Sequence, residues 1–184
     1  MHYTMTLAGL QRDLPLCKVN DELYIGAFVI FGDAELTEAC AAELLKRAPE
    51  YDYIITAEAK GIPLAHEMAR QNGDRDYFVI RKKPKLYMTS VFKTTVRSIT
   101  TDGEQNLYLD GADAEKMKGK RILIVDDVIS TGESLAAIET LVNQTGGIVC
   151  GRMTILAEGD AQKRDDIIYL EKLPLFNPDG SPKA

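Results

Sequence analysis

The apolar positions in three segments of the chain recur at the spacing of one face of an α-helix. In the segment 34–47, which is followed by Pro49, this face contains Leu36, Cys40, Ala41, Leu44 and Leu45. A second helix is predicted over 62–73, where Gly73 closes it, and a third over 132–144.

Short apolar runs between and beyond these helices predict β-strands. The runs cover residues 51–57, 77–81, 121–127, 146–157 and 166–173. Residues 89–101 and 105–111 are rich in β-branched side chains, which predicts two further strands joined around the turn dipeptide Asp102-Gly103. The stretch FNPDGSPKA at the C-terminus is expected to be a loop or tail.

Apolar strands that alternate with amphipathic helices indicate an α/β fold with a mainly parallel sheet flanked by helices. The length of 184 residues fits a single domain. Ligands of such sheets bind at the carboxyl ends of the strands, so the residues that follow each strand are the candidates for function.

The strand over 121–127 ends in two adjacent carboxylates, Asp126 and Asp127, and a loop of small residues follows. The free N–H groups of this loop and the start of the next helix suit a phosphate, and hydroxyl groups add donors: Ser130, Thr131, Ser134. Gly132 lets the main chain approach an anion closely. The carboxylates can accept hydrogen bonds from two neighbouring hydroxyls, so a sugar phosphate matches both halves of the stretch.

A purely structural alternative is a capping box, in which Ser130 is the N-cap of the helix and Glu133 its third residue. It explains the loop but leaves the two carboxylates unexplained. The sequence contains neither a Walker loop nor a G-x-G-x-x-G motif.

The stretch ILIVDDVISTGES, residues 122–134, resembles the phosphoribosyl diphosphate (PRPP) signature of the type I phosphoribosyltransferases. The resemblance implies that Asp126 and Asp127 hold the ribose hydroxyls and that residues 130–134 surround the 5′-phosphate. Glu133 stands where some relatives have Gly, so its side chain should point away from the phosphate.

Two more strand ends fit this family. The stretch after 51–57 resembles the diphosphate loop, in the E-A-[RK]-G form of adenine phosphoribosyltransferases: Glu58, Ala59, Lys60, Gly61. After 77–81, a cluster of cations could balance the charge of the leaving diphosphate: Arg81, Lys82, Lys83, Lys85. Each stretch taken alone would be an ordinary turn or a solvated basic run.

By the same resemblance, residues 86–106 form a flexible hood, and the reaction passes through an oxocarbenium-like state. Mg²⁺ is the expected cofactor, because it bridges diphosphate oxygens and neutralises them. Hood closure should exclude water. Asp126, Asp127 and Glu104 are the candidate catalytic residues, and Glu104 and Asp102, both in the hood, are the candidate acceptors for the proton of the base.

The layout most resembles adenine and xanthine phosphoribosyltransferases, which implies a core of about 34–160 and a small lid from 1–33 and 161–184. Residues 24–31 should then contact the purine. Relatives that use 6-oxopurines generally carry a Lys after the strand over 146–157, but here the next Lys is Lys163, so adenine is the expected acceptor. The alternatives are a 6-oxopurine acceptor and a non-catalytic PRPP sensor like the purine-operon repressors. Relatives are commonly homodimers.

The composition bears on nucleic-acid binding, metal binding and localisation. A net charge of -6 argues against a nucleic-acid partner. The three cysteines and two histidines lack a metal-ligand spacing, so no metal ligands are assigned and reduced cysteines in a cytoplasm are expected. We find no apolar run long enough to span a membrane and expect no signal peptide.

Overall fold

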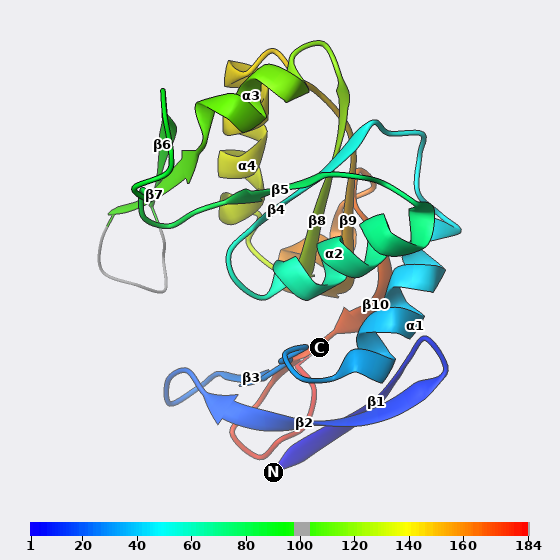
Figure 1. The fold of residues 1–184 in the computed structure, drawn as a ribbon. Helices are drawn as coiled ribbons and strands as arrows, with labels where there is room; N and C mark the ends of the chain where they lie inside the picture. The colour runs from blue at the N-terminus through cyan, green and yellow to red at the C-terminus, as the bar shows by residue number, and fades with distance from the viewer. Residues whose placement is uncertain (98–103, 184) are drawn as a thin grey trace.

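The computed structural model describes residues 1–97 and 104–183, and its centre is a five-stranded parallel sheet (Figure 1). The strands lie in the order β10-β9-β8-β4-β5. Their bounds are β4 Tyr53–Ala57, β5 Tyr77–Ile80, β8 Arg121–Ile129, β9 Ile148–Glu158 and β10 Ile168–Leu173. All four neighbouring pairs are parallel, which confirms the predicted α/β class.

Helices cover both faces of this sheet, because successive side chains of a strand point to opposite sides. Leu123 and Val125 pack with helices α1 (Ala34–Leu45) and α2 (Gly61–Asn72). Ile122 and Ile124 pack with α3 (Gly111–Met117) and α4 (Glu133–Gln144). A short 3₁₀ helix, η1 (Gly159–Lys163), follows β9.

A second, antiparallel sheet contains β1 (His2–Leu7), β2 (Leu10–Lys18), β3 (Tyr24–Gly26) and β11 (Leu175–Phe176). The sequence predicts that the segments 1–33 and 161–184 form a small lid. The structure instead divides the C-terminal segment, because β10 belongs to the parallel sheet and β11 to the second sheet.

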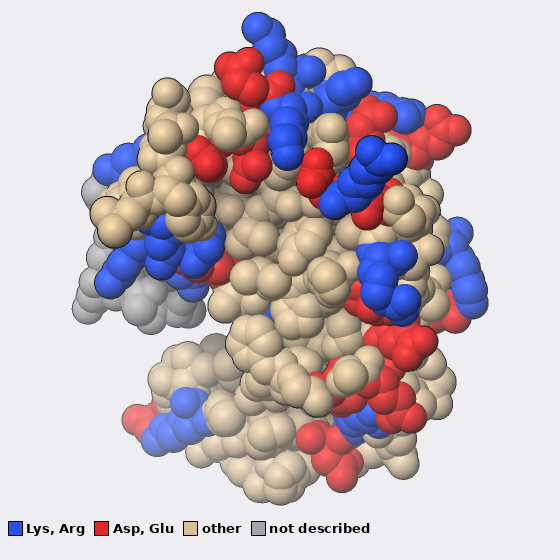
Figure 2. Space-filling view, viewed as in Figure 1, with Lys and Arg blue, Asp and Glu red and all other residues tan. Residues whose placement is uncertain are grey.

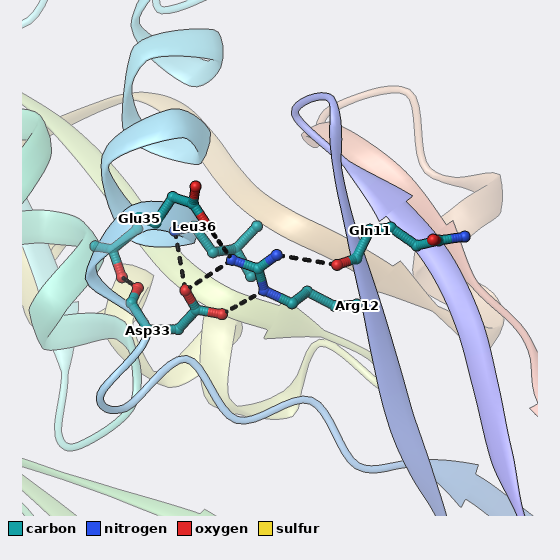
Figure 3. A network of polar contacts seen from close by, with 6 residues as sticks. Gln11, Arg12, Asp33, Glu35 and Leu36 are labelled. Atoms are coloured by element: carbon teal, nitrogen blue, oxygen red, sulfur yellow. Dashed lines mark hydrogen bonds and ion pairs between the residues drawn. The ribbon is translucent and has the colours of Figure 1, made fainter.

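Arg12 of β2 connects the second sheet to the core (Figure 3). Its Nε lies 2.7 Å from Asp33 Oδ2, and its Nη2 lies 2.8 Å from Glu35 Oε2. Asp33 also accepts a hydrogen bond from the backbone N–H of Leu36 at 3.1 Å, so it is the N-cap of α1. One carboxylate therefore both starts a core helix and holds the second sheet.

The hood region forms an antiparallel pair, β6 (Phe92–Arg97) and β7 (Glu104–Leu109). This confirms the two strands predicted there, with shorter bounds. The expected turn at Asp102-Gly103 lies outside the described residues. Within the described part of the chain, no helix is long and apolar enough to cross a membrane.

Candidate functional site

Two adjoining cavities lie at the carboxyl ends of the parallel strands. One has a volume of about 310 Å³ and is lined by Ala57, Glu58, Ala59, Lys60, Lys82, Leu107, Asp126, Asp127, Val128 and Ser134. The other, about 80 Å³, is lined by Asp126, Val128, Ile129, Ser130, Thr131, Gly132, Ser134 and Leu135. The two linings share Asp126, Val128 and Ser134, so the cavities form one continuous site. In Figure 2 the surface is hollowed between the β6–β7 hairpin and the second sheet.

The two carboxylates at the end of β8 differ in environment. Asp127 is only 3% exposed, and its backbone N–H donates to Asp126 Oδ1 at 2.9 Å. Burial, and then the neighbouring Asp127 carboxylate, raise the pKa of Asp126 well above its usual value. Both side chains line the larger cavity, as the sequence predicts.

The loop after β8 does not form the capping box that was the structural alternative. Helix α4 starts at Glu133, and its N-cap is Gly132, with φ +81° and no side-chain cap. Ser130 is therefore not the N-cap. Glu133 lines neither cavity, in keeping with the expected direction of its side chain. Among the backbone N–H groups at this helix start, that of Glu133 donates to Thr131 Oγ1 at 3.5 Å, and the N-cap Gly132 has no side chain to cap the others, which lie next to the smaller cavity.

The loop after β4 lies directly opposite the carboxylates of β8. Lys60 Nζ is 2.9 Å from Asp127 Oδ2 and donates to the Phe28 carbonyl oxygen at 3.3 Å. The peptide between Glu58 and Ala59 is cis. At Gly61 a Cβ atom would lie 2.9 Å from Asp126 Oδ1 and nearer still to a Thr56 oxygen, so a larger residue does not fit there.

The basic run after β5 is divided between two roles. Arg81 Nε pairs with Glu58 Oε2 at 2.7 Å, so this cation is already neutralised. Lys82 lines the larger cavity, whereas Lys85 lines neither cavity. Burial opposes ionisation of Glu58, but the Lys82 N–H and the Arg81 guanidinium outweigh it and hold the Glu58 pKa below its usual value.

The side chains of the two predicted proton acceptors, Glu104 and Asp102, are not among those that the structure describes. Glu104 is the first residue of β7, but its side chain is not described, and Asp102 lies outside the described residues. Leu107, further along β7, lines the larger cavity and brings the hairpin to the site. The role of Glu104 stays a prediction.

Three further groups near the site are not part of the sequence motifs. They are the Phe28 carbonyl, Glu158 at the end of β9, and Arg164 just after η1. Burial raises the pKa of Glu158, and the charge of Lys60 partly offsets this. Phe28 lies within 24–31, the segment that the sequence predicts to contact the purine, whereas Glu158 and Arg164 are revealed only by the tertiary structure.

Comparison with known proteins supports one family. A model of the "Phosphoribosyl transferase domain" matches residues 33–173. The hypoxanthine/guanine phosphoribosyltransferase of Methanotorris igneus is 34% identical over 165 residues, covering 86% of this chain and 86% of that protein. The corresponding protein of Methanocella paludicola is 31% identical over 70% of this chain, and the match spans 64% of that protein's length.

Solved structures agree on the fold. The crystal structure of adenine phosphoribosyltransferase from Thermoanaerobacter pseudethanolicus has a TM-score of 0.67 at 26% identity, covering 78% of this chain and 84% of that one. The Saccharomyces cerevisiae adenine enzyme has a TM-score of 0.65 at 20% identity, covering 92% and 93%. The chain belongs to the type I phosphoribosyltransferase family and, within it, to the purine enzymes.

Proposed function

We propose that this chain transfers the 5-phosphoribosyl group of PRPP to a 6-oxopurine, hypoxanthine or guanine, and releases diphosphate and the nucleoside monophosphate. The observation that carries the proposal is the pair of cavities joined at Asp126, Val128 and Ser134. A phosphate-sized space beside a larger one with two lysines matches a sugar that carries an anion at each end.

Each part of PRPP then has its own partners. The 5′-phosphate would accept hydrogen bonds from the N–H groups of residues 130–134 and from the hydroxyls of Ser130, Thr131 and Ser134. Asp126 and Asp127 would accept hydrogen bonds from the two ribose hydroxyls. The diphosphate would lie in the larger cavity, near Lys60 and Lys82.

The described residues suit a metal that arrives with the substrate. No group of three or more His, Cys, Asp or Glu side chains in residues 1–97 and 104–183 is spaced to hold a metal by itself. Asp127 Oδ2 is buried without an aligned hydrogen-bond donor, so Asp126 and Asp127 would hold Mg²⁺ together with diphosphate oxygens and water. When bound, the ion neutralises charge on the leaving diphosphate.

The residues of the chain mainly place charge and exclude water. Lys60 and Lys82 would stabilise the diphosphate as its bond to the anomeric carbon breaks. The β6–β7 hairpin, through Leu107, would shield the ribose from water. Glu104 would accept the proton released by the attacking ring nitrogen.

The choice of base revises the expectation of adenine. That expectation rested on the absence of a Lys after β9, and Lys163 is indeed 81% exposed and paired with Asp160 at 3.0 Å. The curated relatives at 30–34% identity are nevertheless hypoxanthine/guanine enzymes. Backbone N–H groups can donate to an exocyclic oxygen equally well, so a 6-oxopurine fits without the Lys. Adenine is the second candidate, favoured by the similarity to the Thermoanaerobacter pseudethanolicus structure.

A panel of bases tests the proposal. The protein is incubated with PRPP, Mg²⁺ and hypoxanthine, guanine, xanthine or adenine, and nucleoside monophosphate is measured. Product with hypoxanthine or guanine supports the proposal, and product with adenine alone contradicts it. Binding of PRPP without turnover on any base would indicate the sensor alternative. Light scattering on the same sample tests the expected homodimer.

A further inference from the structure

We infer that Arg164 is a further residue of the 5′-phosphate site, where its guanidinium supplies the positive charge that the loop after β8 does not contain. Residues 128–135 include Glu133 but no Lys or Arg. The loop can therefore offer a phosphate only N–H dipoles and hydroxyls, in a chain with a net charge of -6. The inference rests on the proposed sugar-phosphate function of this cavity.

Arg164 reaches the loop from a distant part of the chain. It directly follows η1, between β9 and β10. A Cβ atom on Gly132 would lie 2.8 Å from Arg164 Nη1, so the guanidinium is in contact with the backbone of the loop. Gly132 itself lines the phosphate-sized cavity. The absent side chain at position 132 is thus what leaves room for a cation at this place.

An ion pair with Asp166 holds the orientation of Arg164. Its Nε and Nη2 donate to the two oxygens of Asp166 at 2.8 and 2.6 Å. Asp166 Oδ2 is also 3.6 Å from Arg152 Nε, and Arg152 in turn pairs with Glu139 of α4. This network leaves Nη1 as the nitrogen that faces Gly132, with no hydrogen-bond partner among the described residues.

The chemistry of Arg suits this role. A guanidinium stays charged at all relevant pH values and forms short, charge-assisted hydrogen bonds with phosphate oxygens. Arg164 itself lines neither cavity, but its side chain is 36% exposed and its Nη1 lies against Gly132, which lines the smaller one. Since Asp166 occupies two of its nitrogens, little side-chain freedom is lost when Nη1 binds a phosphate.

The test compares Arg164→Ala with Lys163→Ala, which removes the same charge from the neighbouring exposed position. Binding of ribose 5-phosphate and of inorganic diphosphate is measured by calorimetry, and the KM for PRPP is measured where turnover occurs. Arg164→Ala should weaken ribose 5-phosphate binding by about 10- to 100-fold and leave diphosphate binding unchanged. Lys163→Ala should change neither, and Arg164→Lys should restore part of the loss.

Two results would overturn the inference: wild-type affinity for ribose 5-phosphate in Arg164→Ala, or an equal loss of ribose 5-phosphate and diphosphate binding. If Arg164→Ala does not fold, Arg164→Gln carries the same comparison with a side chain of similar reach. Ribose 5-phosphate binding needs neither a base nor turnover. A failed base panel therefore counts against the proposed function only, and an unchanged affinity counts against the role of Arg164 only.

Discussion

Lys60 Nζ lies 2.9 Å from Asp127 Oδ2, which joins the loop after β4 to the end of β8. The Asp127 side chain is 4% exposed and the Lys60 side chain 44%. The pair therefore has one partner in the protein interior and one within reach of solvent. The cation assigned to the diphosphate is at the same time the counter-charge of a carboxylate assigned to the ribose. In the proposed complex with PRPP, both groups would share their charge with the substrate.

Removing this cation should affect both stability and substrate binding. We expect Lys60→Met to lower the free energy of unfolding by about 1–3 kcal/mol, because it leaves the buried Asp127 carboxylate without its counter-charge. The KM for PRPP should rise as well. Urea denaturation and steady-state kinetics measure the two effects.

The Asp127→Asn variant controls for this prediction in a double-mutant cycle. The double variant Lys60→Met/Asp127→Asn should lose less stability than the sum of the two single variants. Each single variant leaves one charge of the pair without its partner, whereas the double variant removes both charges. Strict additivity would mean that the ion pair contributes nothing to folding.

The raised pKa of Asp126 predicts a pH dependence with a definite sign. The folded state holds the Asp126 proton more tightly than the unfolded chain, so this contribution to stability is complete below the unfolded pKa, about 3.9. It is lost as the pH rises through the higher folded pKa. Asp126→Asn cannot titrate, so it should gain stability relative to the wild type between pH 4 and pH 7 while it weakens PRPP binding.

Urea denaturation of both proteins across this pH range measures the difference. Groups whose pKa is lowered, such as Asp33 and Glu67, also make stability depend on pH. Both the wild type and Asp126→Asn contain them, so their contribution cancels in the stability difference between the two proteins. A stability difference that does not change with pH would show that the pKa of Asp126 is not raised in the folded protein.

A comparison of two glycines with the same φ angle distinguishes the effect of backbone strain on stability from an effect on substrate binding. Gly132 and Gly9 both have φ +81°, but a Cβ would meet Arg164 only at Gly132, and nothing within 4 Å at Gly9. Each change to Ala should cost about 1–2 kcal/mol of stability, because an L-residue is strained at this angle. Only Gly132→Ala should also raise the KM for PRPP, since it alone changes the phosphate loop. Equal kinetic effects would contradict the assignment of the loop.

The basic run after β5 should divide in the same way. Lys82→Ala is expected to raise the KM for PRPP about 10-fold with little change in Tm, because Lys82 lines the cavity. Arg81→Ala should mainly lower Tm, because Glu58 then loses its ion-pair partner at 2.7 Å. Lys46→Ala, at the residue that directly follows the distant helix α1, controls for the loss of one positive charge. A raised KM for Arg81→Ala and a lowered Tm for Lys82→Ala would instead assign substrate binding to Arg81 and the structural role to Lys82.

Local periodicity in the sequence was enough to predict most of the core. The strands and helices of the parallel sheet, and the positions of the loops after β4 and β8, follow from patterns within 15 residues or fewer, which act through neighbours in the chain. The seven-residue helix α3 and the hairpin β1–β2 were not predicted. Helix α3 is too short for a clear period, and Pro15 lies inside β2, where a Pro normally argues against a strand.

The partners of the charged groups depend on the order of the strands. The contacts Lys60–Asp127, Arg81–Glu58 and Arg164–Gly132 each join positions more than twenty residues apart in the chain. Sequence patterns identify which residues stand at strand ends, but the order β10-β9-β8-β4-β5 settles which of those ends are neighbours. Long-range packing therefore determines which cations are already paired and which face the cavity, and this distinction is absent from the local pattern.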